Sequence, residues 1–556
     1  MTRKINLKLP YLAVAFLLIL LLYTRFFGIN WGLPYPMNPD ERNMANAIQS
    51  LTCPIQSSEF RIQNCFNPHF FAYGQLPLYF GYILVQVYHL FSNKLGNEIS
   101  FTESILSLRL ISAIASMLNV FILLKIINLL IVKEKFTNRI IKFLTAVLFI
   151  FSPGLIQFAH FGTTESLLML FYSVIIYICL LYLERKILNF KFLILSSFVC
   201  GLAIATKVSA LIFITGPLLI FAWRMLRRNI KIRQIRKWIS GTFIFISLTT
   251  IICFIFSPFN FLDLNNFLGS LQFESGVALG KISVFYTRQF TGTIPVLFQF
   301  QKIFPYSLGW PVLILFIFGF LFLPWNKKIN FLRIAFLIYF LPTAFEFTKW
   351  TRFMAPIFPL MLVISCLFLV KLYQGIKNIW LLLIIVFIAV IPGVAYLSIY
   401  QNPDVRLTAS GWIYENIPAD SFILSETANV VDLPIFVPGH PTGVPYKYVS
   451  FDFYDLDNDP LLQLKLAEYL KETNYIFVPS RRIFLNHPKE EYPVLAEYYS
   501  NLFSGKLGFK KIAEFNSFPT VCFPATKLCW VSNDEGAEET WTVFDHPVIR
   551  IFKKTI

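Results

Sequence analysis

A chain of 556 residues with 56% hydrophobic and only 14% charged residues has a mean hydropathy of +0.62. This composition excludes an ordinary soluble protein and predicts a polytopic membrane protein. The net charge of +17 is unevenly spread, because residues 1–400 hold 34 Lys and Arg against 11 Asp and Glu, whereas residues 401–556 hold 14 against 20. Since basic residues beside apolar segments set membrane orientation, the excess requires no nucleic-acid partner.

The first apolar run, about residues 9–28, follows basic residues and lacks a small-residue cleavage site, so it is predicted to be a retained span. Directly after it comes Asn38-Pro39-Asp40-Glu41-Arg42. Two adjacent carboxylates beside a membrane face are costly unless they are solvated or functional. The pair is therefore either part of a reaction site or a solvated acidic loop.

Basic clusters divide the following apolar runs and mark the cytoplasmic side. The run Leu76–Phe91 is apolar enough to cross, but a crossing there would move every later cluster to the other side, so we expect an amphipathic or re-entrant surface helix. The run 189–223 is expected to form two short helices with Lys207 at their outer turn. The predicted spans are 9–28, 104–132, 140–158, 166–184, 189–206, 208–223, 238–257, 306–324, 331–348, 353–372 and 378–399.

About eleven spans place the N-terminus in the cytoplasm and the C-terminal part outside. The predicted fold class is thus a polytopic α-helical membrane domain, residues 1–400, followed by an extracytoplasmic soluble α/β domain, residues 401–556. The membrane domain includes a long outer loop at 29–103. In the C-terminal domain we expect strands at 422–425, 475–478 and 543–552 and helices at 464–472 and 494–502.

Two close cysteine pairs, Cys53/Cys65 and Cys522/Cys529, lie in segments placed outside. They suit disulfides in an oxidising compartment, with free thiols as the alternative. The other four cysteines lie in apolar runs and are expected to be buried.

Charged residues gather at the outer ends of the predicted spans. Glu165 lies in a short outer turn, and Lys207 and Arg352 start or end spans on the same face as Asp40 and Glu41. Each cation alone could extend to lipid head groups. Together, the cations suit a lipid phosphate and a carboxylate suits a general base for a hydroxyl, which favours transfer of a group from a lipid phosphate to an acceptor hydroxyl.

Five short motifs carry a family resemblance. They are Pro39-Asp40-Glu41, Leu76-Pro77-Leu78-Tyr79, Arg109 in Leu108-Arg109-Leu110-Ile111-Ser112-Ala113, Gly201-Leu202-Ala203 with Thr206-Lys207, and Arg352-Phe353-Met354-Ala355-Pro356 with Pro359. Over residues 10–400 the chain resembles the GT-C superfamily of glycosyltransferases that use polyprenyl-phosphate sugars. It is most similar to prokaryotic relatives of protein O-mannosyltransferases and aminoarabinose transferases. A single Pro77, Phe353 and Glu165 depart from the residues usual at these places.

The resemblance implies a role for each matching residue. Asp40 would be the general base, Glu41 its support, and Glu165 a second acidic catalytic residue. Lys207 and Arg352 would bind the donor phosphate, and Arg109 would anchor the outer loop. The reaction would invert the anomeric carbon of a sugar on a polyprenyl-phosphate donor and place it on a protein, lipid or glycan acceptor. No cofactor or catalytic metal is expected, although Asp40, Glu41 and Glu165 with His160 could hold a divalent cation.

Two other functional classes fit the composition. A polytopic lipid or glycan transporter would place charges near the midplane and show internal repeats, whereas here the charges gather at one face and no repeat is visible. A scaffold whose outer domain binds a partner would not need the acidic motif. The C-terminal motif Glu538-Glu539-Thr540-Trp541-Thr542-Val543-Phe544-Asp545-His546-Pro547 is interpreted as a structural turn rather than a site.

Overall fold

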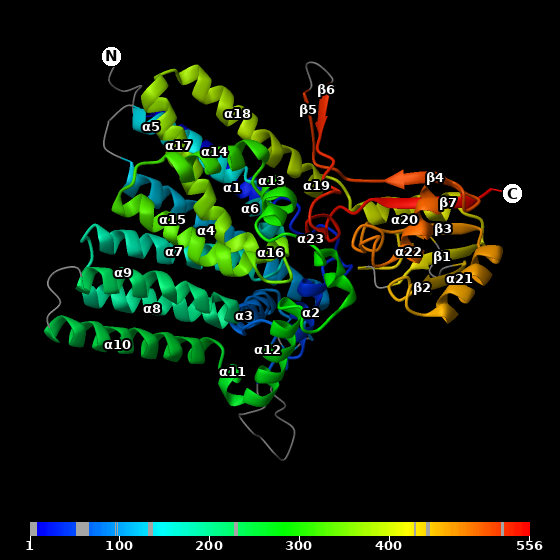
Figure 1. Ribbon diagram of the computed structural model, residues 1–556, viewed down its shortest axis with the longest axis horizontal. Coiled ribbons are helices and arrows are strands. Elements are labelled where there is room, and N and C mark those ends of the chain that lie inside the picture. Colours follow the sequence, from blue (N-terminus) through cyan, green and yellow to red (C-terminus); the bar gives the residue numbers. More distant parts are fainter. Residues whose placement is uncertain are drawn as a thin grey trace.

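The computed structural model describes residues 8–51, 66–94, 96, 98–131, 137–226, 232–427, 430–440, 445–523 and 528–555. Long helices form a bundle from the first 400 residues, and a small α/β domain covers one end of it (Figure 1). The predicted fold class, a polytopic α-helical bundle followed by a small α/β domain, is confirmed, whereas the side of the membrane on which that domain lies stays a prediction. Cys53 and Cys65 lie outside the described residues.

Seven helical segments in the described part of the chain are long and apolar enough to cross a membrane, and two bent helix pairs raise the number to as many as nine. The seven are α4 (Phe101–Leu130), α7 (Glu165–Leu183), α8 (Asn189–Thr206), η3 with α9 (Val208–Ile214 and Thr215–Leu226), α10 (Ile232–Phe256), α16 with η6 and α17 (Thr351–Met354, Ala355–Ile357 and Phe358–Ile376), and α18 with α19 (Ile379–Tyr396 and Ser398–Gln401).

The two bent pairs correspond to the predicted spans 140–158 and 306–324. Helix α5 (Thr137–Ile150) meets α6 (Pro153–His160) at 49°, and η5 with α13 (Gln299–Ile303 and Phe304–Ser307) meets α14 (Trp310–Phe322) at 116°. The first bend falls at Pro153, which cannot continue a helical hydrogen-bond ladder. The second falls at Gly309, whose φ of 82° is a conformation that glycine adopts without strain.

The two remaining predicted spans, 9–28 and 331–348, are helical as well, as α1 (Lys8–Phe26) and α15 (Lys327–Ala344). All eleven predicted segments therefore form helices. The number of crossings is consistent with eleven and remains a prediction.

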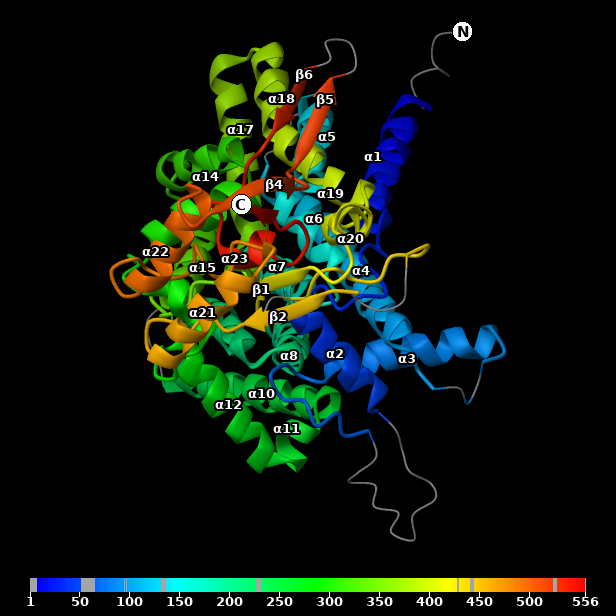
Figure 2. The ribbon, with the colours of Figure 1, turned by 90° about the vertical axis from the view of Figure 1, so that its right-hand side faces the viewer.

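Helix α3 (Leu76–Phe91) runs crosswise to α7, α8 and α10, end-on in Figure 1 and along its length in Figure 2. Its last turns expose Val87, Leu90 and Phe91, while Leu76 and Leu78 at its start are buried. A helix in this orientation with an exposed apolar end suits the membrane interface rather than a crossing. This agrees with the surface helix expected for the segment.

Several short helices cover the same end of the bundle as the α/β domain. They are α2 (Pro39–Gln49), α11 (Phe259–Leu262), α12 (Leu264–Ala278) and η4 (Phe285–Phe290). Helix α2 packs on α3 and α4 through Met44 and Ile48, which are fully buried. This packing fixes the acidic motif at the start of α2 against the bundle.

The C-terminal domain is built on a five-stranded sheet with the order β2-β1-β3-β7-β4. Strand β1 pairs in parallel with β2 and β3, and β7 pairs antiparallel with β3 and β4. Its elements are α20 (Val405–Asn416), β1 (Phe422–Glu426), β2 (Lys447–Phe451), α21 (Pro460–Glu472), β3 (Tyr475–Val478), α22 (Pro493–Phe503), β4 (Phe509–Phe515), β5 (Thr520–Phe523), β6 (Leu528–Val531), α23 (Glu539–Thr542) and β7 (Ile549–Lys554).

The predicted strands and helices of this domain occur, but one boundary was wrong. The last strand begins at Ile549 instead of 543, because residues 543–548 form a buried turn after α23. Helix α20, strands β2 and β4 and the β5–β6 hairpin were not predicted.

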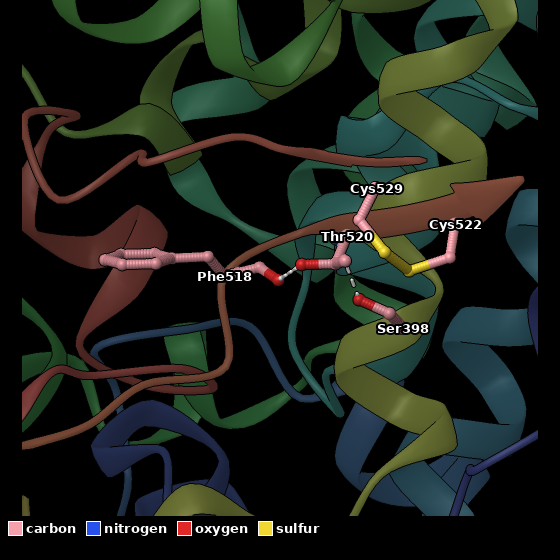
Figure 3. The surroundings of a disulfide bond; sticks show 5 residues. All are labelled: Ser398, Phe518, Thr520, Cys522 and Cys529. Atoms are coloured by element: carbon pink, nitrogen blue, oxygen red, sulfur yellow. Dashed lines mark hydrogen bonds between the residues drawn. A yellow bond between two sulfur atoms is a disulfide. The ribbon is translucent and has the colours of Figure 1, made fainter. Parts of the chain in front are cut away.

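The hairpin carries a disulfide between Cys522 and Cys529, which are opposite each other in its register. Figure 3 shows it beside α18 and α19, where the Thr520 N–H donates to the Ser398 hydroxyl over 3.0 Å. Cys179, Cys200, Cys253 and Cys366 are free and buried, as expected.

The bundle and the C-terminal domain share one hydrophobic cluster. Ile156 of α6 and Tyr396 of α18 lie in it with Trp541 of α23 and Ile549 of β7, and all four are at most 2% exposed. Each large apolar side chain buried in this way contributes about 1.5–3 kcal/mol. The domain is therefore docked on the bundle through a common core.

Candidate active site

The acidic motif forms the first turn of α2. The Asn38 side chain caps this helix by accepting from the backbone N–H groups of Asp40, over 3.0 Å, and Glu41, over 3.4 Å. Carboxylates are favoured in a first helical turn by the helix dipole. Because successive helical residues point about 100° apart, Asp40 and Glu41 reach different surroundings.

Glu41 is fully buried and pairs with Arg109 of α4. Arg109 donates from Nε and Nη2 to the two carboxylate oxygens over 2.6 and 2.8 Å, and from Nη1 to the backbone oxygens of Ile29 and Trp31. The Gly162 N–H donates to Oε1 of Glu41 over 2.7 Å. Both oxygens of Glu41 are thus occupied, and the pair ties α2, α4, residues 29–31 and the turn before α7 together.

Gly162 has to be a glycine for this arrangement. A Cβ there would lie 2.6 Å from Cβ of Leu108 and 3.0 Å from Oε1 of Glu41. The close approach lets the backbone N–H reach the carboxylate directly.

Asp40 instead forms an ion pair with Arg352 of α16, and both side chains keep about a fifth of their surface exposed. The Arg352 guanidinium lies over the rings of Trp350 and Phe353, with Cζ 4.7 and 5.9 Å from the ring centroids. Aromatic faces stabilise a cation in place without neutralising it. Arg352 is therefore held by two aromatic rings and by the carboxylate of Asp40.

Glu165 and Lys207 form a second pair at the same end of the bundle. Lys207 Nζ lies 3.5 Å from Oε1 of Glu165, which also accepts from the Thr164 hydroxyl over 3.2 Å. Lys207 follows the last residue of α8, where a cation is favoured by the helix dipole. Its ammonium lies 4.9 Å from the Tyr73 ring centroid and 5.4 Å from that of Phe353. Phe353 therefore contacts both cations.

A cavity of about 390 Å³ opens where these pairs meet. Lys207 and Arg352 line it with Tyr73, and the helices η3, α12 and α15 complete its wall. Two further carboxylates, Glu274 of α12 and Glu346 after α15, also line it. Burial raises the pKa of Glu274, while the nearby charges of Arg352 and Lys207 act to lower it. The cavity thus combines two cations with carboxylates in a mostly apolar wall.

Sequence reasoning brought Asp40, Glu165, Lys207 and Arg352 to one face. In the structure Lys207 and Arg352 line one cavity, and Glu165 and Asp40 are their ion-pair partners. Sequence reasoning did not single out Glu274 or Glu346. With only 11 acidic residues in the first 400, the rarity of carboxylates in an apolar sequence was a signal that could have found both.

His160 does not face the carboxylates. Its ring nitrogens lie 2.8 Å from the backbone oxygens of Ile156 and Phe27, and the ring stacks on Tyr400 with centroids 3.8 Å apart. Across the described ranges, no group of three or more His, Cys, Asp or Glu side chains is arranged to hold a metal ion. The acidic cluster that we considered for a divalent cation is thus divided, since Glu41 belongs to the Arg109 pair.

In comparisons with known proteins, one segment of the chain matches a protein family, and most of the chain matches the fold of solved structures. Residues 68–267 match the family described as dolichyl-phosphate-mannose-protein mannosyltransferase, a segment that includes Arg109, Glu165 and Lys207. Two structures of the oligosaccharyltransferase AglB from Archaeoglobus fulgidus match at 11% identity. One has a TM-score of 0.51 and covers 95% of this chain and 75% of the other, and the apo form has 0.50 and covers 98% and 88%. The chain has the GT-C fold.

ArnT from Cupriavidus metallidurans is also similar, at 13% identity and a TM-score of 0.44 over 75% of this chain and 66% of ArnT. No sequence among the curated proteins matches the chain. The family segment lies within the membrane part of this GT-C fold, and Asp40 and Arg352 lie on either side of it in the sequence.

Proposed function

We propose that the protein is an integral-membrane, inverting glycosyltransferase that moves a sugar from a polyprenyl-phosphate donor to an acceptor hydroxyl at the outer face. The observation that carries the proposal is a cavity lined by Lys207 and Arg352, each in an ion pair with a carboxylate, Glu165 or Asp40. Glu165 and Lys207 lie within the segment that matches the mannosyltransferase family. Two cations suit the donor phosphate, and the released carboxylates suit the acceptor.

A second cavity supports a lipid-linked donor. It has about 420 Å³ and lies farther along α9 and α15, lined by Leu219, Trp223, Ile334 and Ile338. Ile212 of η3 and Tyr339 of α15 line the first cavity, so residues of η3–α9 and of α15 line both cavities. Two mostly apolar cavities along these helices, one of them lined by two cations, fit a polyprenyl chain with its phosphate beside Lys207 and Arg352. The AglB structure with a TM-score of 0.51 is a complex with a dolichol-phosphate and an inhibitory peptide.

The proposed chemistry is one displacement. The donor phosphate takes Arg352 and Lys207 from their carboxylates, and the acceptor oxygen attacks the anomeric carbon as the bond from that carbon to the phosphate oxygen breaks. The acceptor proton passes to Asp40, and the polyprenyl phosphate leaves with its charge stabilised by both cations. Positioning of the reacting groups and charge stabilisation at the leaving phosphate supply much of the rate.

The remaining residues receive different roles. We assign Glu165 to positioning of the acceptor or sugar. We assign Glu41 with Arg109 to fixing α2 against the bundle, because Glu41 is fully buried and both of its oxygens already accept hydrogen bonds. The two side-chain cations supply the charge that the leaving phosphate needs, so the proposed reaction requires no metal or other cofactor. The acceptor is a hydroxyl on a protein, lipid or glycan.

The protein is a multi-pass membrane protein. We place its N-terminus in the cytoplasm and the C-terminal domain outside, at the plasma membrane, on the strength of the basic loops. Labelling of Lys510→Cys in intact cells with a membrane-impermeant maleimide tests this orientation. If the cysteine is labelled only after the cells are broken, and not in intact cells, the orientation is contradicted.

The deciding experiment is a screen of polyprenyl-phosphate sugars, including polyprenyl-phosphate mannose, with the purified protein and mass spectrometry of the products. Lys207→Ala should lower turnover by about 100-fold through loss of a charge that stabilises the leaving phosphate. A matched control is Glu184→Gln, which breaks the partly exposed Lys328 ion pair at 2.8 Å in another part of the bundle. Equal turnover of Lys207→Ala and the control contradicts the site. Lipid movement without any product favours the transporter alternative.

A further inference from the structure

The C-terminal motif 538–547 enters the junction between the C-terminal domain and the bundle. It contains the short helix α23, whose first residues follow Glu538, and helix α23 contacts α16, the four-residue helix that carries Arg352. Nothing in the proposed chemistry explains why this part of a separate domain reaches the element that holds a site cation.

Glu538 makes the direct connection. It is 1% exposed, and its Oε2 accepts from the backbone N–H of Thr351 over 2.9 Å and from the Thr351 hydroxyl over 2.8 Å. Its Oε1 accepts from Gln289 over 3.2 Å, and its own N–H donates to the Lys302 oxygen. The carboxylate therefore holds the residue immediately before Arg352.

Helix α16 needs such a partner. Helix α16 is the first turn of the helical segment that continues through η6 into α17, and the N–H groups of such a first turn have no partner within the helix. The Glu538 carboxylate accepts one of these N–H groups, and its charge also acts on Arg352. Glu538 therefore binds the start of the helical turn that carries Arg352.

The rest of the motif fixes Glu538 in turn. His546 lies between two carboxylates, 2.5 Å from Asp545 and 2.9 Å from Asp534, and Asp534 also accepts from Trp541 over 3.0 Å. The second oxygen of Asp545 accepts from three membrane-domain side chains, Tyr396 over 2.8 Å, Tyr400 over 3.0 Å and Gln157 over 3.2 Å. These polar groups are almost completely buried, and their hydrogen bonds link the C-terminal domain to three side chains of the bundle in one arrangement.

We propose that Glu538 is a positioning residue for Arg352, and that the buried cluster of Asp534, Asp545 and His546 docks the C-terminal domain so that Glu538 can act. The inference rests on the proposed function, in which Arg352 binds the donor phosphate. The C-terminal domain then completes the phosphate site of the membrane domain, in addition to any contact it makes with an acceptor.

The test measures binding of undecaprenyl phosphate to the full-length protein by native mass spectrometry. Glu538→Ala should weaken binding about 10- to 100-fold, because even a small displacement of a positioned group is costly. Glu535→Ala is the matched control, since this neighbouring carboxylate binds Arg550 of the same domain over 2.6 and 2.8 Å. It should bind the lipid like the unaltered protein.

A double-mutant cycle separates positioning from a general loss of structure. Arg352→Ala alone should weaken binding, and Glu538→Ala should add nothing to it, because both changes remove the same contact. Thr351→Val should weaken binding more than Thr351→Ser, which keeps the hydroxyl donor. These threonine variants decide the matter if Glu538→Ala does not fold.

Two outcomes are distinguishable failures. If Arg352→Ala binds undecaprenyl phosphate normally, the phosphate role fails and the inference falls with it. If Arg352→Ala is defective while a folded Glu538→Ala and Thr351→Val bind normally, or if the effects of Glu538→Ala and Arg352→Ala add, the inference alone is overturned.

Discussion

Asp40 and Glu41 are neighbours in one helical turn, yet their ion pairs differ in kind. Glu41 is fully buried, and Arg109 and Gly162 occupy its oxygens. Asp40 is about one-fifth exposed and meets Arg352 at a cavity rim. A buried pair that loses one partner leaves an uncompensated charge, whereas an accessible pair can exchange partners with a ligand. The first arrangement suits structure and the second suits chemistry.

The largest effect on turnover is expected at Asp40, whose ion pair is assigned to the chemistry. Asp40→Asn should lower kcat about 1,000-fold through loss of the general base. It should lower the free energy of unfolding by only about 1 kcal/mol, because the pair is partly solvated. Turnover and thermal unfolding of the purified protein measure the two effects. Near-normal turnover of the folded variant contradicts the assignment of Asp40 as the base.

The opposite pattern is expected at Glu41. Glu41→Gln should destabilise the protein by about 3–5 kcal/mol because Arg109 is left buried with its charge unpaired. The change should appear as a lower Tm and lower yield, with a smaller loss of kcat per folded molecule than in Asp40→Asn. Adding Arg109→Gln should recover part of the stability, since no unpaired charge then remains. A stable but inactive Glu41→Gln would place Glu41 in the chemistry and break the comparison.

The smallest effect is expected on the pH dependence of stability, at a third ionic cluster, in which His546 lies between Asp534 and Asp545. Burial alone would lower the pKa of His546, but Asp534 and Asp545 raise it to about 10 from the usual 6.5. A raised folded pKa contributes stability that is complete below pH 6.5 and is lost as the pH rises toward 10. The Tm should therefore fall across this interval, and His546→Gln should flatten the fall. An equal slope in both proteins contradicts the charged state of His546.

Much of the fold followed from the sequence because apolar runs and basic clusters are local signals. The surface position of Leu76–Phe91 required only that later basic loops remain on one side. The start of the last strand could not be predicted in the same way, because Val543 and Phe544 are as apolar as strand residues but are buried in a turn against the bundle.

The sequence predicted which residues form the site better than it predicted which of them form ion pairs with each other. Asp40, Glu165, Lys207 and Arg352 were expected on one face, but the direct contact of Asp40 with Arg352 joins residues 312 positions apart. Such pairing depends on the rotation of α2 and on the place of α16, which Glu538 of another domain helps to set. The motif 538–547 was interpreted as a structural turn, and only the tertiary contacts reveal what the turn holds.

The ion pair between Asp40 and Arg352 has a kinetic consequence. While Arg352 is paired with Asp40, the guanidinium engages the carboxylate, so an acceptor hydroxyl that arrives first has to compete with Arg352 for it. The donor phosphate removes that restraint when it takes the guanidinium. The two substrates are therefore expected to bind in a compulsory order, the lipid donor first and the acceptor second, because the Asp40–Arg352 ion pair has to open before the acceptor can use Asp40.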